Sequence, residues 1–443
     1  MNIILINPYD IYGGAEKIAC QLVSIYNKMG HNACLVVSHK FSEYKFVVEI
    51  PHPAKPSIIK FINKIYQSYS GKGFLKKLLR QLEEPGSIRK IFTGREKPGH
   101  IDFKNLLDEV GFSPEIVHFH NVRGIGPQLI CSAARFFPVL ITLHDLWLLT
   151  GKCVQPGECT GWKSGCNNCI QAWFPLFPVK NGIFKNLKEK IECLTAAKPY
   201  ISTPSLWAMN MVNNSYIGKV ARELKIIHNG VDLSIFKPGN KIEARRKLGL
   251  PEQVNILLVS GKELKTNRYK NFRMLKKIAV LLGNKSTGKR VIMLCLGDKG
   301  KKEFYRNLEI RFIPFKDDEN LVAEYYRSAD VFASAAENET WGLTVSEAMA
   351  CGTPVVAFSN GGIKEQIIDG KTGFLIPVNC PEKMTESIKR LFDDAQLNKK
   401  ISLEASLYAR QNFDIKDTAL KYLEFYQHIL KKRRNNENSK GGN

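Results

Sequence analysis

Short apolar segments, each followed by the pattern of an amphipathic helix, recur along almost the whole chain. The first apolar run, Ile3–Ile6, leads through Gly13 and Gly14 into a segment with an apolar face at helical spacing, which ends at Gly30. Runs this short and this uniformly apolar are typical of parallel strands covered by helices on both faces. The repeated pattern therefore predicts an α/β fold built on parallel sheets.

The pattern forms two series that a turn-rich segment separates. The first series continues with strands predicted at Ile116–His120, Val139–Leu143 and Tyr200–Pro204. After the turn dipeptide Asn229-Gly230, a second series begins with a strand at Asn255–Ser260 and includes a helix at Glu319–Ser328. Two such series predict two open sheets.

The two series define the expected domains. We predict two Rossmann-like domains, residues 1–232 and 233–412, that face each other across a cleft, where open α/β sheets bind their ligands. An amphipathic helix at 413–432 is expected to pack back towards the first domain. The polar tail 433–443 is expected to be disordered.

The charge of the chain points to anionic partners. Lysine and arginine outnumber aspartate and glutamate by 65 to 42, a net charge of +23. More than a third of this excess lies in segment 55–97, which holds eleven basic and three acidic residues interleaved with apolar ones. Two interpretations stay open: a solvated helical insert, or a basic amphipathic surface for an anionic membrane or a phosphate-bearing lipid acceptor.

The sequence offers no sign of secretion or membrane insertion. The N-terminal apolar run lacks a basic n-region and a cleavage site, and no run reaches the ~18 apolar residues of a membrane span. Eleven cysteines spread along the chain do not resemble a secreted disulfide framework. We therefore expect a cytoplasmic protein, peripheral at the inner face of the cell membrane if segment 55–97 binds lipid.

The stretch from Ala335 to Gly362 carries the most informative pattern. A predicted strand ends in a loop with Glu339 and Gly342, and a short helix is expected to begin at Thr344. Thr344 and Glu347 have the spacing of a capping box, in which the glutamate folds back on its own helix terminus. A helix N-terminus after a glycine-containing loop also suits a pyrophosphate, because its free N–H groups and dipole attract anions.

These residues resemble a known family. Glu339 and Glu347, with seven residues between them in ETWGLTVSEAMACGTPVV, are similar to the signature of the retaining glycosyltransferases of family four, which have the GT-B fold. IIHNGVDLSIFKP, GGIKEQIIDGKTGFLIPV and the N-terminal GGAE also match this family, in its order. The resemblance implies a hexosyltransferase-type enzyme of bacterial surface-polysaccharide assembly, which transfers a sugar from a nucleotide-sugar donor to a glycan or lipid-linked acceptor.

The resemblance also implies roles for individual residues. Glu347 would bind the ribose hydroxyls of the nucleotide, and Glu339 would hold the sugar beside its anomeric carbon. Lys270 would neutralise the diphosphate, with Asn271 standing where the family prefers glycine. Further donor contacts are expected from Gly13, Gly14, Lys262, Arg268, Gly342, Leu343 and Thr344. The alternative is that these basic side chains belong to an ordinary solvated loop without a binding role.

Histidines at strand ends are the candidates for the acceptor side. His144, in TLHDLW, resembles the family's active-site histidine, and Asp145 is expected either to orient it or to cap a helix. His118 and His120 flank Phe119, and we expect them to point to opposite faces of the strand. His120, at the strand end, is the better candidate for the cleft. The alternative for His144 is a satisfied core histidine.

A cluster of four cysteines follows this histidine. The cluster has the pattern C-x5-C-x6-C-x2-C and consists of Cys153, Cys159, Cys166 and Cys169. Four thiols at this density suit a closed structural zinc site, and the alternative is a group of reduced or redox-labile thiols. No D-x-D metal clamp stands out, so no cofactor is expected for catalysis.

Other functions compete with sugar transfer. A GT-B-like sugar-nucleotide epimerase would use a similar donor site. A dinucleotide oxidoreductase is weaker, because G-x-G-x-x-G is absent after Ile6. A non-enzymatic membrane or nucleic-acid binder would explain the charge, but no nucleic-acid reader motif is present, and we expect no nucleic-acid partner.

Overall fold

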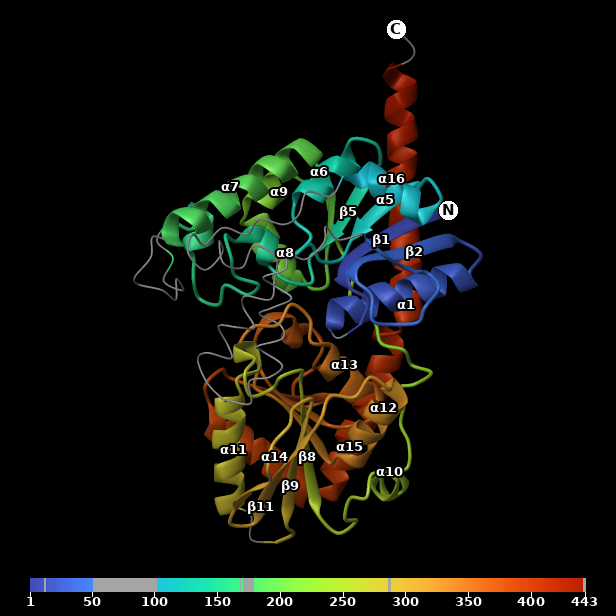
Figure 1. The fold of residues 1–443 in the computed structure, drawn as a ribbon. Coiled ribbons are helices and arrows are strands. Elements are labelled where there is room, and N and C mark those ends of the chain that lie inside the picture. Colours follow the sequence, from blue (N-terminus) through green and yellow to red (C-terminus); the bar gives the residue numbers. More distant parts are fainter. Residues whose placement is uncertain (12, 51–101, 168, 170–178, 286–287, 441–443) are drawn as a thin grey trace, which may run out of the picture.

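The computed structural model describes residues 1–11, 13–50, 102–167, 169, 179–285 and 288–440. The described residues form two α/β domains, one above the other in Figure 1. The predicted α/β class with two Rossmann-like domains is therefore confirmed. The basic segment 55–97 lies outside the described residues.

The N-terminal domain is built on a parallel sheet whose described strands lie in the order β3-β2-β1-β4-β5-β6-β7. The strands are β1 Asn2–Tyr9, β2 Asn32–His39, β3 Val47–Glu49, β4 Ile116–Phe119, β5 Val139–Thr142, β6 Tyr200–Thr203 and β7 Glu223–Ile226. The helices are α1 Gly14–Lys28, α5 Phe103–Val110, α6 Gln128–Ala134, α7 Val179–Ala197, α8 Leu206–Asn213 and α9 Tyr216–Val220, with short turns η1 Trp147–Leu149 and η2 Gly161–Ser164.

The C-terminal domain repeats the plan, with described strands in the order β10-β11-β9-β8-β12-β13-β14. Its strands are β8 Asn255–Ser260, β9 Val291–Leu296, β10 Glu303–Tyr305, β11 Leu308–Ile313, β12 Val331–Ser334, β13 Val355–Phe358 and β14 Gly373–Ile376, and β10 runs antiparallel to β11. Its helices are α10 Lys241–Lys247, α11 Phe272–Lys285, α12 Glu319–Ser328, α13 Leu343–Ala350, α14 Pro381–Asp393, α15 Ala395–Asn412 and α16 Ile415–Lys440, with η3 Arg268–Lys270 and η4 Gly361–Glu365.

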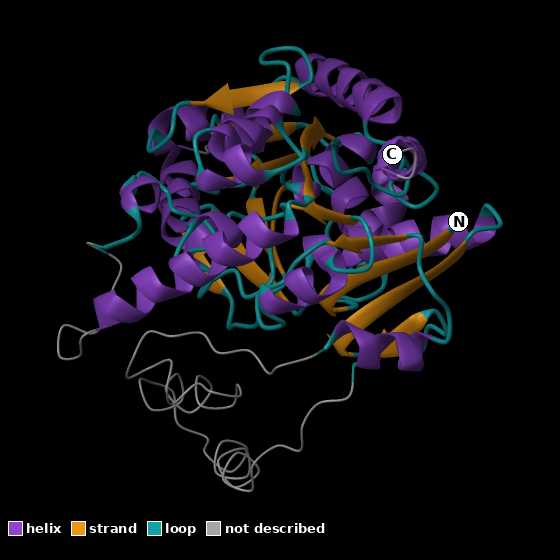
Figure 2. Ribbon diagram, turned by 90° about the horizontal axis from the view of Figure 1, so that it is seen from above, coloured by secondary structure: helices purple, strands orange, loops and turns teal. Residues whose placement is uncertain are grey.

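Both sheets are buried on both faces, which explains their uniformly apolar strands. In β1, Ile4 and Ile6 pack with α5 and α6, whereas Ile3 and Leu5 pack with α1 and α16. The view from above shows helices on both sides of the strands (Figure 2). No helix of the described residues is both long and apolar enough to cross a membrane.

Two neighbouring segments connect the domains. Val231 and Asp414 form a parallel bridge, in which Val231 N–H donates to the Phe413 carbonyl at 2.8 Å and Ile415 N–H donates to the Val231 carbonyl at 3.1 Å. Gly230 allows this approach, because a Cβ there would lie 2.5 Å from the backbone of Ile415. The chain therefore crosses between the domains twice at one place.

Helix α16 follows the second crossing and runs along the N-terminal domain (Figure 1), where Tyr422, Phe425 and Tyr426 are fully buried. The expected disorder of 433–443 is wrong as far as Lys440, because the helix continues to that residue. Extending an existing helix costs far less than nucleating one. An ion pair of 2.8 Å between Arg433 and Glu437, one turn apart, supports the extension.

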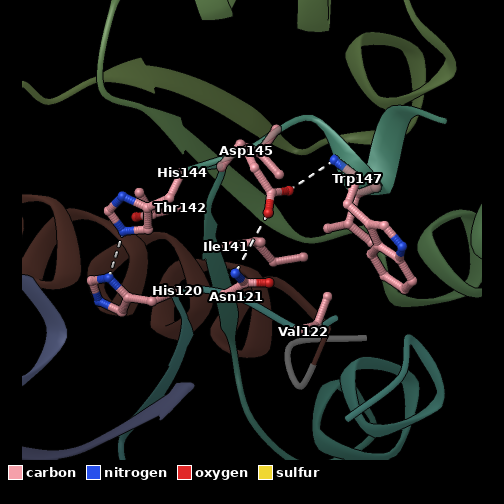
Figure 3. Close-up of a pocket in the computed structure, with 10 residues that line it drawn as sticks. His120, Asn121, Val122, Ile141, Thr142, His144, Asp145 and Trp147 are labelled. Carbon is pink, nitrogen blue, oxygen red and sulfur yellow. Dashed lines mark hydrogen bonds between the residues drawn. The ribbon is translucent and has the colours of Figure 1, made fainter. Parts of the chain in front are cut away.

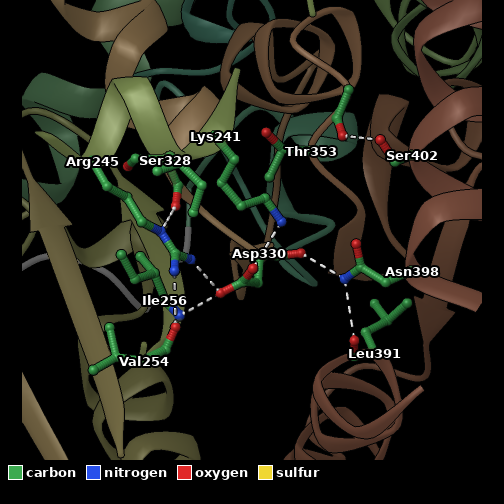
Figure 4. A network of polar contacts seen from close by, with 12 residues as sticks. Lys241, Arg245, Val254, Ile256, Ser328, Asp330, Thr353, Leu391, Asn398 and Ser402 are labelled. Carbon is green, nitrogen blue, oxygen red and sulfur yellow. Dashed lines mark hydrogen bonds and ion pairs between the residues drawn. The ribbon is translucent and has the colours of Figure 1, made fainter. Parts of the chain in front are cut away.

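An acid at the base of the C-terminal domain fixes the segment that follows the first crossing (Figure 4). Asp330 pairs with Lys241 and Arg245 of α10, each at 2.7 Å, and accepts from the Ile256 N–H at 2.8 Å. Asn398 of α15 donates to the Asp330 carbonyl at 3.0 Å. The network ties α10 and α15 to the sheet.

Candidate active site

The N-terminal ends of α1 and α13 meet between the two domains. A Cβ added to Gly14, the first residue of α1, would lie 3.2 Å from Leu343 Cδ1, the first residue of α13. Neither helix has a side-chain cap, and Gly13 and Gly14 are exposed. The first turns of two helices therefore lie against each other, with the Glu16 carboxylate over Gly13 at the start of α1. Helix N-termini are favourable for an anion such as a diphosphate.

The predicted capping box is wrong. Helix α13 begins at Leu343, and its N-cap is Gly342, which adopts φ +103°. Glu347 does not fold back: one carboxylate oxygen pairs with Lys17 Nζ at 2.7 Å, and the other accepts from the Tyr326 hydroxyl at 2.8 Å. Lys17 and Tyr326, from two other helices, thus bind the carboxylate in place of the N-terminus of α13. The Glu347 side chain is almost buried.

Glu339 and Lys270 come together on the same side of the site. Lys270 Nζ lies 3.0 Å from Glu339 Oε2, and both side chains are partly exposed. The loop of Glu339 is fixed from behind, because Gly362 N–H donates to the Glu339 carbonyl at 2.9 Å. A Cβ on Gly361, which adopts φ +51°, would lie 2.1 Å from that carbonyl oxygen. Only glycine fits there without displacing Glu339.

The loop before α11 holds Asn271 in a left-handed backbone conformation. Asn271 has φ +50°, the left-handed conformation in which glycine is common and asparagine is the best-tolerated substitute. Its side chain donates to Glu337 at 2.9 Å. Lys262 is close enough to Glu16 to oppose the upward shift that burial gives to the pKa of Glu16. Arg268 lies on η3 beside Lys270.

The histidines of β4 and β5 gather on one side, so the prediction of opposite faces is wrong. The rings of His118 and His120 lie 4.1 Å apart, because residues two positions apart in a strand share a face. His118 contacts the Tyr426 hydroxyl at 2.6 Å and Thr142 Oγ1 at 2.7 Å, a buried position against α16.

His120 and His144 form a pair at the ends of β4 and β5. His120 Nδ1 lies 2.8 Å from His144 Nε2 (Figure 3). Burial lowers the pKa of His144 to about 3, and burial followed by the neighbouring histidines lowers the pKa of His120 well below its usual range. Both rings are therefore neutral near pH 7 and suited to hydrogen bonding rather than to charge stabilisation.

A small pocket with a cavity volume of about 10 Å³ adjoins this pair. Its lining includes His120, Asn121, His144, Asp145 and Trp147 (Figure 3). Asp145 Oδ1 accepts from the backbone N–H of Trp147, the first residue of η1, at 2.8 Å. The pocket thus lies at the C-terminal ends of β4 and β5, on the side expected for the acceptor.

The cysteine-bearing loop lies close to the donor side. A Cβ on Gly157 would lie 3.6 Å from Asn338 Nδ2, beside Glu339. The four cysteines are half-buried, and burial raises the pKa of the Cys153 thiol to about 11. Among the described residues no group of three or more His, Cys, Asp or Glu side chains is arranged to hold a metal ion, and zinc at Cys153, Cys159, Cys166 and Cys169 stays a prediction. Elsewhere, Cys131 and Cys193 bring their sulfur atoms into contact between α6 and α7.

The sequence analysis did not identify several residues that connect the two domains at this site. Lys17 reaches from α1 to Glu347, and Thr340 donates from its hydroxyl to the His144 carbonyl across the domains. Glu365 accepts from the N–H groups of Leu206 and Trp207 at 2.7 and 2.8 Å, and so caps α8 of the other domain. These partners are 158 to 330 residues apart, so no local pattern signals them.

Parts of this chain are similar in sequence to known proteins. Residues 240–407 match the family described as "Glycosyl transferases group 1". D-inositol 3-phosphate glycosyltransferase of Corynebacterium efficiens is 31% identical over 221 residues, which cover 46% of this chain and 50% of the relative. The corresponding enzyme 1 of Catenulispora acidiphila is 30% identical over 295 residues, which cover 63% and 64%. The chain spans about half the length of the first of these relatives.

Solved structures match nearly the whole fold. Sucrose-phosphate synthase from Thermosynechococcus elongatus superposes with a TM-score of 0.64 at 17% identity, and covers 96% of this chain and 98% of its own. HepE of Anabaena in complex with UDP-glucose gives a TM-score of 0.61 at 16% identity, with 96% and 99% covered. The match to the glycosyl transferases group 1 family covers residues 240–407, and the two parallel sheets form a two-domain GT-B fold.

Proposed function

We propose that this chain is a retaining glycosyltransferase that moves a sugar from a nucleotide-sugar donor to a glycan or lipid-linked acceptor in polysaccharide biosynthesis. The observation that carries the proposal is the contact between the N-terminal ends of α1 and α13. The paired side chains of Glu339 and Lys270 and the nearly buried Glu347 belong to the same site. This arrangement offers separate places for diphosphate, sugar and ribose.

The donor would lie across the N-termini of both helices. Its diphosphate would accept hydrogen bonds from Gly14, Leu343 and Thr344, and its ribose hydroxyls would donate to Glu347. Breaking the bond between the anomeric carbon and the phosphate oxygen leaves the electron pair, and hence negative charge, on the diphosphate. Helix termini and Lys270 stabilise that charge in the transition state, which is the largest contribution that fixed groups make to such a reaction.

The acceptor would approach from the side of His120 and His144, at the C-terminal ends of β4 and β5. Its hydroxyl oxygen would bond to the anomeric carbon on the face that the diphosphate leaves, and its proton would pass to the leaving phosphate. Configuration is then retained without an enzyme nucleophile. Glu339 would hold sugar hydroxyls beside the reacting carbon, and neutral His144 would position the sugar or the acceptor.

Donor turnover tests the proposal. The protein is incubated with UDP-, GDP- and ADP-sugars, and UDP-glucose comes first because a structure of similar fold contains it. Inositol phosphate, suggested by the relatives' names, and a lipid-linked glycan pool serve as separate acceptors. Release of nucleoside diphosphate with an α-linked product from an α-linked donor is expected. Conversion of the donor without transfer would instead indicate an epimerase, and no turnover together with tight nucleic-acid binding would contradict both.

A further inference from the structure

Lys17 connects the two domains at the centre of the candidate site. Its Nζ lies 2.7 Å from Glu347 of α13 and 2.8 Å from Glu319 of α12, and 4.4 Å from the centre of the Phe236 ring. Lys17 belongs to the first turn of α1, the same turn that presents Gly14 to Leu343. The bridge therefore joins the N-terminal domain to two helices of the C-terminal domain.

The surroundings distinguish this bridge from an ordinary surface ion pair. The Glu347 side chain is 8% exposed, and its second oxygen is held by the fully buried Tyr326. Burial lowers the pKa of Lys17, but the carboxylates of Glu347 and Glu319 outweigh this effect and raise the pKa above its usual value. Lys17 thus stays charged and separates two carboxylates that would otherwise repel each other.

We propose that Lys17 is a positioning residue that couples nucleotide binding at Glu347 to closure of the two domains, an inference that rests on the proposed function. Each carboxylate oxygen has two acceptor positions. Lys17 and Tyr326 occupy one on each oxygen, which leaves one on each for a pair of ribose hydroxyls. Lys17 fixes the plane of the carboxylate in this orientation.

The coupling follows from the position of Lys17 on α1. The bridge to Glu347 forms only when α1 lies against α13, and a diphosphate held by both helix N-termini requires the same arrangement. Bridge and nucleotide therefore favour the same closed state, and each strengthens the other by the same factor. Gln21, one turn further along α1, also points its amide at Glu319 at 3.4 Å.

Calorimetric binding of UDP, GDP and ADP to the full chain tests the inference. Lys17→Met is expected to weaken binding of the recognised nucleotide by about tenfold or more, within the usual range of coupling between sites. Lys17→Arg should restore much of the affinity, because it keeps the charge. Lys28→Met, on an exposed position of the same helix, is the matched control and should bind like wild type.

A double-mutant cycle with Glu347→Gln separates coupling from simple loss of stability. Lys17→Met should add little to the loss that Glu347→Gln already causes, and small-angle scattering without nucleotide should show Lys17→Met to be less compact than wild type. Wild-type affinity in a folded Lys17→Met protein, or multiplicative losses in the cycle, would overturn the inference alone. If Lys17→Met does not fold, Lys17→Arg and Lys17→Gln decide by the same criteria. Failure of wild type to bind any of the three nucleotides would overturn the proposed function, and the inference with it.

Discussion

Replacing Glu339 by glutamine removes one charge beside the proposed reacting carbon and leaves the loop geometry in place. The Glu339 and Lys270 side chains are 23% and 20% exposed. A pair this open to solvent contributes about 1 kcal/mol or less to stability. Loss of a charge-assisted contact to the reacting sugar costs about 3–4 kcal/mol in the transition state, so kcat should fall roughly 100- to 1000-fold.

Glu347→Gln should behave differently, because the Glu347 carboxylate is nearly buried between Lys17 and Tyr326. Breaking a buried ion pair costs about 3–5 kcal/mol. The lower limit applies here, since Lys17 keeps Glu319 at 2.8 Å. At roughly 2–4 °C per kcal/mol for a domain of this size, a loss of about 3 kcal/mol lowers the melting temperature by roughly 6–12 °C. Nucleotide affinity should fall as well.

Initial rates of nucleoside diphosphate release and thermal unfolding, measured on the same preparations, separate the two effects. Glu337→Gln is the matched control, because it lies two positions away and its amide oxygen can still accept from Asn271. Glu339→Gln should lower kcat and leave the melting temperature near that of wild type. An unchanged kcat with a large fall in melting temperature would show that Glu339 supports its loop and takes no part in the reaction.

Three further outcomes follow from the structure. The free energy of unfolding should be greatest above about pH 6.5 and should fall by up to about 1.4 kcal/mol per pH unit below it for each buried histidine. The cause is that the unfolded chain takes up protons on His118, His120 and His144, whereas these side chains stay neutral in the fold. Denaturant unfolding at pH 7.5 and 5.5 checks this, and equal stability at the two pH values would refute it. Gly361→Ala places a side chain in the left-handed region of backbone conformation and against the Glu339 carbonyl, so the variant should lose at least about 1 kcal/mol of stability and most of its turnover. Wild-type rates would contradict the view that Gly361 holds Glu339 in place. Metal analysis of protein purified without added metal should find about one zinc per chain, and four freely titrating thiols at Cys153, Cys159, Cys166 and Cys169 without zinc would end that prediction.

Elements dominated by local pattern could be predicted closely from the sequence. The predicted Asn255–Ser260 strand and Glu319–Ser328 helix coincide with β8 and α12 residue for residue. Both have an apolar pattern that matches their burial, and α12 begins after Asp318, whose side chain accepts from the Asn320 N–H. By contrast, β7 and β10 were not predicted, because their residues are only partly buried and mix charged with apolar side chains.

Contacts between the domains could not be predicted, and they decide the chemistry of the site. A capping box was a sound local interpretation of Thr344 and Glu347, but Lys17, 330 residues away in sequence, takes the carboxylate instead. The expectation that His118 and His120 point to opposite faces was wrong, because residues two positions apart in a strand share a face. Polar tail residues after 432 looked disordered, yet a helix already held by buried Tyr422 and Tyr426 extends through them.

A crystal structure with the recognised nucleoside diphosphate tests the central claim most directly. The account predicts the diphosphate between Gly14 and the Leu343–Thr344 end of α13, with the ribose hydroxyls on Glu347 and Lys17 still bound to the same carboxylate. A nucleotide bound away from both helix N-termini, or a ribose that does not contact Glu347, would contradict it.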